Sequence, residues 1–273
     1  MYPYFKVFDW RIPAYGMMLV FGVILANLCA YRTCRKKRIA FWQIWVLEGY
    51  AFLGAMLGAK VLYLLVSFEQ IDWSAWRDLR YVNSIMSGGF VFYGGLAAGI
   101  AACMCAGRVH HIPVLSLLSE VIYTVPLAHG FGRIGCLLAG CCYGIPYNGI
   151  FAVSYPSAQY GQAAGVTYLP VQCIETVCLW LLSLLLLWCS EKRQKSEKQP
   201  AYVMAVNGQE RNGAACEPVV FYFLGYGVLR FFLEFFRGDA DRGYVGALSV
   251  SQGISLVIII ASVSYVIRKK NNI

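Results

Sequence analysis

Seven long apolar runs dominate the sequence and restrict the folds open to the chain. A helix needs about 20 apolar residues to cross the hydrocarbon core of a bilayer. The pattern therefore predicts an all-α, polytopic membrane protein with about seven transmembrane helices. The runs extend over residues 12–31, 41–68, 88–106, 112–130, 171–189, 217–236 and 247–267.

The composition agrees with this class. Apolar residues make up 59% of the chain and charged residues 14%, against roughly 45–50% and 25% in soluble domains. Too little polar side chain remains to cover a soluble globule, and disordered, collagen-like and small disulfide-stapled proteins are excluded. The net charge of +9 lies mostly in runs beside the apolar segments. This favours an anionic membrane surface over nucleic acid as the partner.

The basic residues also predict an orientation, because Lys and Arg accumulate in cytoplasmic loops. Fourteen of the 23 lie in alternate connections and the tail, seven lie in the other connections, and Lys60 and Arg230 lie inside spans. This asymmetry predicts an N-terminus outside and a cytoplasmic C-terminus. The first apolar run lacks the flanks of a secretory signal and is expected to be a retained span.

We expect a single domain over residues 1–273. Residues 132–170 are rich in Gly, Tyr and Pro, a composition unlike that of a linker, and are expected to form a packed extracytoplasmic element. The polar cytoplasmic loop at residues 190–216 is expected to be mobile. The sequence contains no visible internal repeat.

Five ionisable residues within the predicted spans call for an explanation, because each costs about 2.5–3.5 kcal/mol unless it faces protein or water. Arg230 and Glu234 are four residues apart and share a helical face, which Arg237 continues. Two interpretations are open: an ion pair that fixes helix packing, or an anion site in which Glu234 orients Arg230. Lys60 is either a snorkelling residue or a functional one. The five are Lys60, Glu120, Glu175, Arg230 and Glu234.

The segment 129–144 (HGFGRIGCLLAGCCYG) is the richest in candidate functional residues. Glycines in it allow a ligand or a helix to approach the backbone, and an arginine can hold a phosphate bidentately. Two arginines from distant parts of the chain, Arg133 and Arg230, therefore indicate a lipid headgroup pocket. If the segment is helical, four residues share one face: Arg133, Cys136, Gly140 and Gly144.

Three of the eleven cysteines, Cys136, Cys141 and Cys142, are crowded in this segment. Zinc is disfavoured because the spacing lacks a CxxC pair and His129 is a single candidate histidine. A disulfide is open on an oxidising side, although the sequence does not choose its partners. The favoured interpretation is small thiols that pack against lipid or helices, with no metal.

Two tyrosines have alternative interpretations. Tyr93 lies among glycines that allow tight helix packing, and the same geometry would expose its ring toward a cavity. Tyr15 lies at the outer end of the first span, where an interfacial aromatic anchor is typical.

Together these residues resemble the prolipoprotein diacylglyceryl transferase family over most of the chain. The strongest match is the Gly-Arg motif at residues 132–135, which continues to Gly144. The other matches stand in family order: Tyr15-Gly16, Gly58-Ala-Lys60, Phe92-Tyr-Gly-Gly95, Pro170-Val-Gln-Cys-Ile-Glu175, residues 230–239 and residues 248–255.

The resemblance implies a reaction at the bacterial inner membrane that uses no metal or diffusible cofactor. The lipobox cysteine that follows a prolipoprotein signal peptide attacks the glyceryl carbon of phosphatidylglycerol. Glycerol phosphate leaves, and a diacylglyceryl thioether remains as the first product of lipoprotein maturation. The chemistry requires cations for the leaving phosphate and a base for the thiol proton. The implied partners are phosphatidylglycerol, the prolipoprotein and membrane lipids, and not nucleic acid.

By the same resemblance, Arg133 binds the lipid headgroup, Arg230 stabilises the departing phosphate, and Glu234 has a positioning role. Tyr93 completes the implied catalytic set. With Arg133, the residues implied to bind substrate are Tyr15, Lys60, Gly94, Gly95, Cys136, Cys141, Gly144 and Gln172.

The sequence departs from the family pattern at four of these positions. Tyr93 stands where the family often has a favoured base, His, and a tyrosine with a pKa near 10 is a poorer base at neutral pH. Cys136 and Cys141 replace a familiar Asn and Glu, and Lys60 replaces a common Arg, which keeps the charge without the fork. Two alternatives therefore stay open: a same-fold paralogue with another acceptor, and a non-enzymatic lipid-binding or transport protein.

Overall fold

A computed structural model describes residues 3–155, 162–163, 165–196, 201–206, 217–238, 243–246 and 248–271. Six of its helices are long and apolar enough to cross a membrane, or seven if one bent pair forms a single span. These helices coincide with the seven predicted runs. The prediction of an all-α polytopic membrane protein is therefore confirmed.

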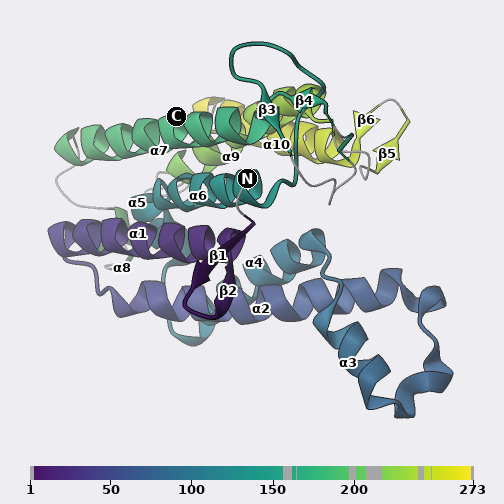
Figure 1. Ribbon diagram of the computed structural model, residues 1–273. Coiled ribbons are helices and arrows are strands. Elements are labelled where there is room, and N and C mark those ends of the chain that lie inside the picture. The colour runs from purple at the N-terminus through teal and green to yellow at the C-terminus, as the bar shows by residue number, and fades with distance from the viewer. Residues whose placement is uncertain are drawn as a thin grey trace. The chain divides into compact units, whose positions relative to one another are not determined.

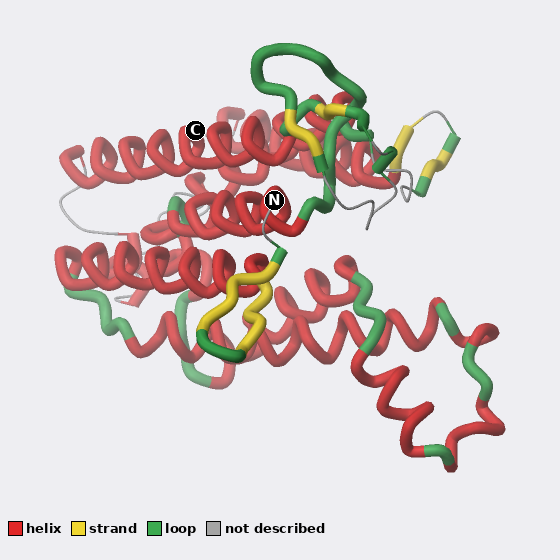
Figure 2. The backbone as a smooth tube through the Cα atoms, in the orientation of Figure 1, coloured by secondary structure: helices red, strands yellow, loops and turns green. Residues whose placement is uncertain are grey.

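The helices and strands follow one another along the chain as Figure 1 labels them. The helices are α1 Ala14–Lys37, α2 Trp42–Val66, α3 Leu79–Ser87, α4 Phe92–Val109, α5 Val114–Val121, α6 Thr124–Ala139, α7 Val171–Ser196, α8 Ala201–Val206, α9 Glu217–Leu233 and α10 Val250–Asn271. Short 3-10 helices are η1 Phe68–Gln70, η2 Trp73–Arg77 and η4 Glu234–Phe236. Figure 2 shows the strands, which pair as antiparallel hairpins: β1 Tyr4–Val7 with β2 Trp10–Pro13, β3 Val153–Ser154 with β4 Thr167–Tyr168, and β5 Tyr244–Val245 with β6 Leu248–Ser249.

The chain divides into two compact units. Unit 1 comprises residues 1–37 and 118–273, and unit 2 comprises residues 38–117. In unit 1, α1 packs on α6, α6 on α7, and α9 on both α7 and α10. In unit 2, α2 packs along α4. The expectation of a single domain stays a prediction.

Small residues set the spacing of the two long helices of unit 2. A Cβ atom added at Gly58 in α2 would overlap the carbonyl oxygen of Gly94 in α4, and the reverse also holds. At Gly54, an added Cβ would lie 2.8 Å from the carbonyl oxygen of Ala98. Membrane helices commonly associate through such faces, because lipid is as apolar as their side chains and close packing must supply the attraction.

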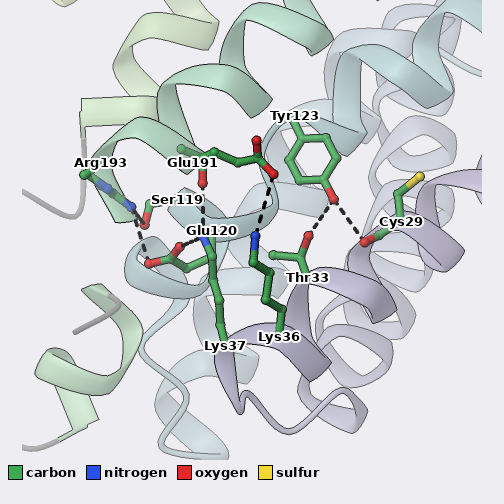
Figure 3. A network of polar contacts seen from close by, with 10 residues as sticks. Cys29, Thr33, Lys36, Lys37, Ser119, Glu120, Tyr123, Glu191 and Arg193 are labelled. Carbon is green, nitrogen blue, oxygen red and sulfur yellow. Dashed lines mark hydrogen bonds and ion pairs between the residues drawn. The ribbon is translucent and has the colours of Figure 1, made fainter. Parts of the chain in front are cut away.

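A buried polar network joins α1, α5 and α7 in unit 1 (Figure 3). The Lys37 ammonium donates to Glu120 and to Ser190, the latter at 3.0 Å. The Arg193 guanidinium lies 3.3 Å from the other carboxylate oxygen of Glu120. Glu120 is 1% exposed, so these two cations offset much of the cost of burying its charge. The network gives Glu120 a role in helix packing.

Part of the segment after α6 forms a small aromatic core. The rings of Tyr143, Tyr155 and Tyr168 gather in a small core, with centroids 4.9 to 6.0 Å apart. The segment begins after Ala139 rather than near residue 132, because α6 continues to that residue. Its extracytoplasmic location stays a prediction.

The polar loop expected at residues 190–216 is in part helical. Helix α7 continues to Ser196 and α8 covers Ala201–Val206. Residues 197–200 and 207–216 lie outside the described residues, so the expected mobility stays a prediction.

The glycine contact in unit 2 yields a stability prediction. Gly58→Ala places a methyl group against the Gly94 carbonyl oxygen, and overpacking of this kind costs about 1–3 kcal/mol. We expect a lower unfolding temperature in detergent, measured by loss of the monodisperse protein on heating.

Gly49→Ala is the matched control in the same helix, because an added Cβ there meets nothing within 4 Å. Alanine favours a helix interior by roughly 0.5–1 kcal/mol over glycine, so this variant should be as stable as the parent protein or more so. Equal unfolding temperatures for the two variants would contradict the packing account.

Candidate functional site in unit 1

Helix α6 carries Arg133 into a buried contact with α7. The Arg133 Nε atom lies 3.0 Å from Glu175 Oε1, with side chains 15% and 3% exposed. The beginning of α1 lies against the same helix, since a Cβ at Gly135 would stand 3.0 Å from the Tyr15 ring and 3.1 Å from its Cα. The beginning of α1 therefore packs on α6 at Gly135, and a shared substrate-binding role for Tyr15 and Arg133 stays a prediction.

A second cation cluster is formed by α9, η4 and α10. Arg230 Nη2 lies 2.8 Å from Glu234 Oε2 and donates to Ser251 Oγ at 3.2 Å. The predicted i, i+4 pair is confirmed. Arg237 Nη1 lies 3.9 Å from the same carboxylate oxygen.

Arg237 reaches Glu234 from outside the helix. The prediction that Arg237 continues the helical face of Arg230 is wrong, because α9 ends at Leu233 and tightens into η4. The backbone at Arg237 is extended, with φ −80° and ψ 139°. The contact therefore depends on the turn at the end of η4, and not on helical periodicity.

His129 of α6 and Tyr226 of α9 are in ring contact and lie near both arginine clusters. Their ring centroids are 5.4 Å apart, and both residues are within electrostatic range of Arg133 and Arg230. The two ion pairs thus belong to one buried polar region that α6, α7, α9 and α10 enclose.

Two guanidinium nitrogens in this region are buried without a hydrogen-bond partner among the described residues: Arg133 Nε, which has Glu175 at 3.0 Å as its ion-pair partner, and Arg230 Nη1. The Gln172 Oε1 atom is also buried and has no hydrogen-bond partner among the described residues. A buried donor or acceptor without a partner costs about 1–3 kcal/mol, and more for a charged group. An anionic oxygen placed here would satisfy Arg230, and a phosphate suits the fork of a guanidinium.

The motif leaves the helix at Gly140. This residue adopts φ +83°, and its N–H donates to the carbonyl oxygens of Cys136 at 2.9 Å and Leu137 at 3.2 Å. A glycine in this left-handed conformation commonly ends a helix. The prediction that Gly140 and Gly144 continue the helical face of Arg133 is therefore wrong, whereas Arg133 and Cys136 do lie on α6.

Gly144 is instead the point where three backbone segments meet. Its N–H donates to the Leu169 carbonyl oxygen at 3.2 Å, and the next residue, Ile145, donates to Phe236 at 2.9 Å. Gly238 donates to the Tyr143 carbonyl oxygen at 3.0 Å. Because a Cβ at Gly144 would overlap the Leu169 carbonyl oxygen, only glycine allows this approach. The contact holds the central motif beside η4.

Gln172 anchors the turn after α6. Its Nε2 donates to the Cys141 carbonyl oxygen at 2.7 Å and to the Tyr155 hydroxyl at 3.1 Å. Burial raises the pKa of Tyr155, so this hydroxyl stays protonated at neutral pH. Gln172 is 1% exposed, and its contact with substrate stays a prediction.

The remaining predicted site residues belong to unit 2. The Lys60 ammonium is buried and donates to three backbone carbonyls that follow or end α3: Ile85, Gly88 at 2.6 Å and Gly89 at 3.4 Å. These bonds occupy its three donors and favour a structural role at a helix C-terminus. Its role in substrate binding stays a prediction.

Tyr93 is exposed at the surface of unit 2, whereas the neighbouring Gly94 and Gly95 pack against α2. Gly94 and Gly95 face α2, where an added Cβ at Gly95 would lie 3.0 Å from the Ala55 carbonyl oxygen. The Tyr93 side chain is 39% exposed and its ring lies 5.7 Å from that of Phe92. The tight-packing interpretation holds for the glycines, while the catalytic role of Tyr93 stays a prediction.

Sequence reasoning missed the groups that complete the buried region. Glu175 was recognised as an intramembrane charge, but its pairing with Arg133 was not predicted. Tyr226 carries no signal, because a single polar residue in an apolar run has no spacing that identifies a partner on another helix. The match at residues 248–255 includes Ser251 but does not identify its partner. The charged residues within the membrane spans can be identified from the sequence, but their ion-pair partners on other helices depend on tertiary structure.

Comparisons with known proteins show the family to which the chain is similar. A family model described as prolipoprotein diacylglyceryl transferase matches residues 3–268. A phosphatidylglycerol–prolipoprotein diacylglyceryl transferase of Clostridium tetani is 32% identical over 259 residues, covering 95% of this chain and 94% of that protein. One from Clostridium perfringens is 31% identical, with coverage of 94% and 91%. One from Finegoldia magna is 28% identical, with coverage of 98% and 96%.

The Arg133–Glu175 pair yields a second stability prediction. Glu175→Gln removes the charge opposite a buried guanidinium, and breaking a buried pair in this way costs about 3–5 kcal/mol. We expect a clear fall in the unfolding temperature in detergent.

Glu191→Gln is the control in the same helix, since Glu191 and its partner Lys36 are 56% and 60% exposed at 3.7 Å. Exposed pairs contribute about 0–1 kcal/mol, so this variant should unfold near the parent temperature. If Glu175→Gln is no less stable than Glu191→Gln, Arg133 does not depend on Glu175.

Proposed function

The chain belongs to the prolipoprotein diacylglyceryl transferase family, and we propose that it transfers the diacylglyceryl group of phosphatidylglycerol to the lipobox cysteine of a prolipoprotein. The family match over residues 3–268 supports the reaction class. The names of the similar clostridial proteins support the two substrates.

The unsatisfied donor of Arg230 is the observation that carries the proposal for the site. The Lys37–Glu120–Arg193 network is also a buried cluster of charges, yet none of its side-chain atoms is among the buried atoms without a hydrogen-bond partner in the described part of the chain. Arg230 Nη1 is. A permanently cationic donor that meets no hydrogen-bond acceptor among the described residues favours an anionic ligand, and the lipid phosphate has the matching chemistry.

The chemistry needs this cation when the phosphate departs. The cysteine sulfur forms a bond to the glyceryl carbon, the bond from that carbon to the phosphate oxygen breaks, and glycerol phosphate takes the electron pair. Negative charge therefore grows on the leaving oxygen. A fixed guanidinium at that oxygen stabilises the transition state more than the ground state, which is how a cation accelerates such a step.

Arg133, Arg230 and Glu234 have separate roles in the proposed reaction. Arg133, held by Glu175, binds the phosphatidylglycerol headgroup. Arg230 stabilises the leaving phosphate, and Glu234 fixes the position of Arg230 through their 2.8 Å contact. Tyr15 and Gln172 line the pocket beside Arg133.

The thiol proton must also be removed, and we assign this to Tyr93 through its hydroxyl. A neutral tyrosine accepts a proton poorly at neutral pH, so Tyr93 acts as a hydrogen-bond partner of the thiol while the proton passes to solvent. The assignment rests on the place of Tyr93 in the family motif.

The location and orientation follow from the same proposal. We place the chain in the bacterial inner membrane with the N-terminus outside and the C-terminus in the cytoplasm. The positive residues of the alternate loops support this orientation, which puts the segment after α6 on the side where secreted prolipoproteins are presented.

The role of Arg230 is tested with a purified enzyme, phosphatidylglycerol in nanodiscs and a lipobox peptide, with the thioether product measured by mass spectrometry. Arg230→Lys keeps the positive charge but removes the planar guanidinium that can bind a phosphate through two hydrogen bonds. Removal of one preorganised donor typically lowers kcat by about 100- to 1,000-fold, and we expect a loss in this range.

Arg193→Lys is the matched control, because Arg193 is also a largely buried arginine paired with a carboxylate, at 15% exposure against 11% for Arg230. It should keep the parent kcat. Equal rates for the two variants would refute the role of Arg230. No product from the parent enzyme with this peptide, but product with another thiol, would favour the paralogue.

The role of Tyr93 is tested by comparing Phe and His at that position. Tyr93→Phe removes the hydroxyl and should lower kcat by about 100-fold, a typical contribution of proton transfer. Tyr93→His should restore much of the rate, since a histidine with a pKa near 6.5 accepts a proton at neutral pH. If Tyr93→Phe keeps the parent kcat, Tyr93 is only an interfacial residue.

A further inference from the structure

The three cysteines of the central motif form a compact cluster of sulfur atoms. The Sγ atoms of Cys136, Cys141 and Cys142 all lie within 4.8 Å of one another. Cys136 is buried at the end of α6, and the other two are half-buried in the turn that follows. The proposed transfer reaction uses none of these sulfur atoms as a nucleophile. Their arrangement therefore calls for a separate explanation.

The sulfur separations fit coordination of a single ion. With metal–thiolate bonds of about 2.3 Å, three sulfur atoms in a plane around an ion stand about 4.0 Å apart, and in a tetrahedron about 3.8 Å apart. Both values lie inside the observed limit. Among the described residues, no His, Asp or Glu side chain joins the three sulfur atoms.

We propose that Cys136, Cys141 and Cys142 form a three-coordinate site for a soft, thiophilic cation of the Cu(I) class. Soft thiolate ligands select such ions, whereas carboxylates and waters select hard ones. Structural zinc sites almost always have four protein ligands, and this cluster offers three. The donor set therefore favours a trigonal monovalent ion over zinc.

The surroundings supply compensating charge. A monovalent cation bound by three thiolates carries a net charge of −2, which is costly to bury without a partner. The guanidinium groups of Arg133 and Arg237 both lie within electrostatic range of Cys142. Arg133, which the proposed function places at the lipid headgroup, and Arg237, which contacts Glu234, thus offset the charge of a loaded thiolate site.

The fold holds the cluster together without the ion. The left-handed Gly140 turns the chain back over α6, and Cys142 itself adopts φ +57°, which is uncommon for a residue other than glycine. The Cys141 carbonyl oxygen accepts from Gln172, and the Tyr143 carbonyl oxygen accepts from Gly238. Because folding has already paid for the ordering of these ligands, binding loses less entropy.

The site lies one turn of α6 after Arg133, but the inference does not rest on the proposed transfer reaction. Binding exchanges the thiol protons for the cation and involves no redox change when the ion is supplied as Cu(I). A direct measurement of bound metal tests it, whether or not the protein shows transferase activity.

The experiment titrates the full-length protein, reduced and anaerobic in detergent, with Cu(I) supplied as its bicinchoninate complex. Loss of the coloured complex reports transfer of copper to the protein, and X-ray absorption reports its ligands. We expect one Cu(I) per chain with three sulfur ligands at about 2.3 Å. Cys142→Ser should weaken binding by at least about 100-fold, beyond the 10–100-fold typical for loss of an outer partner.

Cys178→Ser is the matched control, since Cys178 is a half-buried cysteine of α7 outside the cluster. It should bind copper as the parent does. Cys136→Ser provides an independent second test, and size-exclusion profiles verify that each variant is folded.

Three results would overturn the inference. The first is copper binding that Cys136→Ser and Cys142→Ser leave unchanged, because other cysteines would then hold the ion. The second is displacement of the copper by an equal amount of Zn(II), which would indicate a four-coordinate site. The third is a disulfide within the cluster in protein isolated anaerobically without reductant.

Discussion

Burial of guanidinium groups between apolar helices is the constraint on which unit 1 depends. A charge in this environment is tolerated only where another charge or a hydrogen-bond partner faces it. Glu175 on α7 meets Arg133 on α6, and Glu234 meets Arg230 and Arg237 after the end of α9. The Arg133–Glu175 pair joins two helices that are far apart in the sequence, whereas the Glu234 contacts are local and fix the end of α9. The same charges that make the helices costly to insert therefore determine how they pack.

The backbone of the central motif, residues 129–144, holds the two arginine clusters of unit 1 close together. The turn at Gly140 and the close approach at Gly144 bring the end of α6 against η4, so that the Arg133 helix and the Arg237 segment border one region. Gln172 fastens the turn from the side of α7. An anion that binds Arg230 would enter a site whose walls are already held by hydrogen bonds, which lowers the entropic cost of binding.

The sequence predicted the helices well and the ends of two of them poorly. Six of the apolar runs became single long helices, and the run at 112–130 became the bent pair α5 and α6, because length and hydropathy decide membrane spans almost alone. The Arg230–Glu234 pair was predictable, since both residues lie on one helical face. The helical interpretation failed at Gly140 and Arg237, because a glycine in an apolar run can pack a helix or end it. Contacts with Leu169 and Phe236 decide the outcome, and these are tertiary. The partner of Arg133 was hidden for the same reason.

The most direct test of the account is the release of glycerol phosphate from headgroup-labelled phosphatidylglycerol by the purified protein. The account predicts release only when an acceptor thiol is present, in equal amount to the thioether formed, because the sulfur must attack as the phosphate leaves. Release without an acceptor would indicate a lipase. Tight lipid binding with no release under any condition would contradict the central claim that the buried arginines serve a transfer reaction.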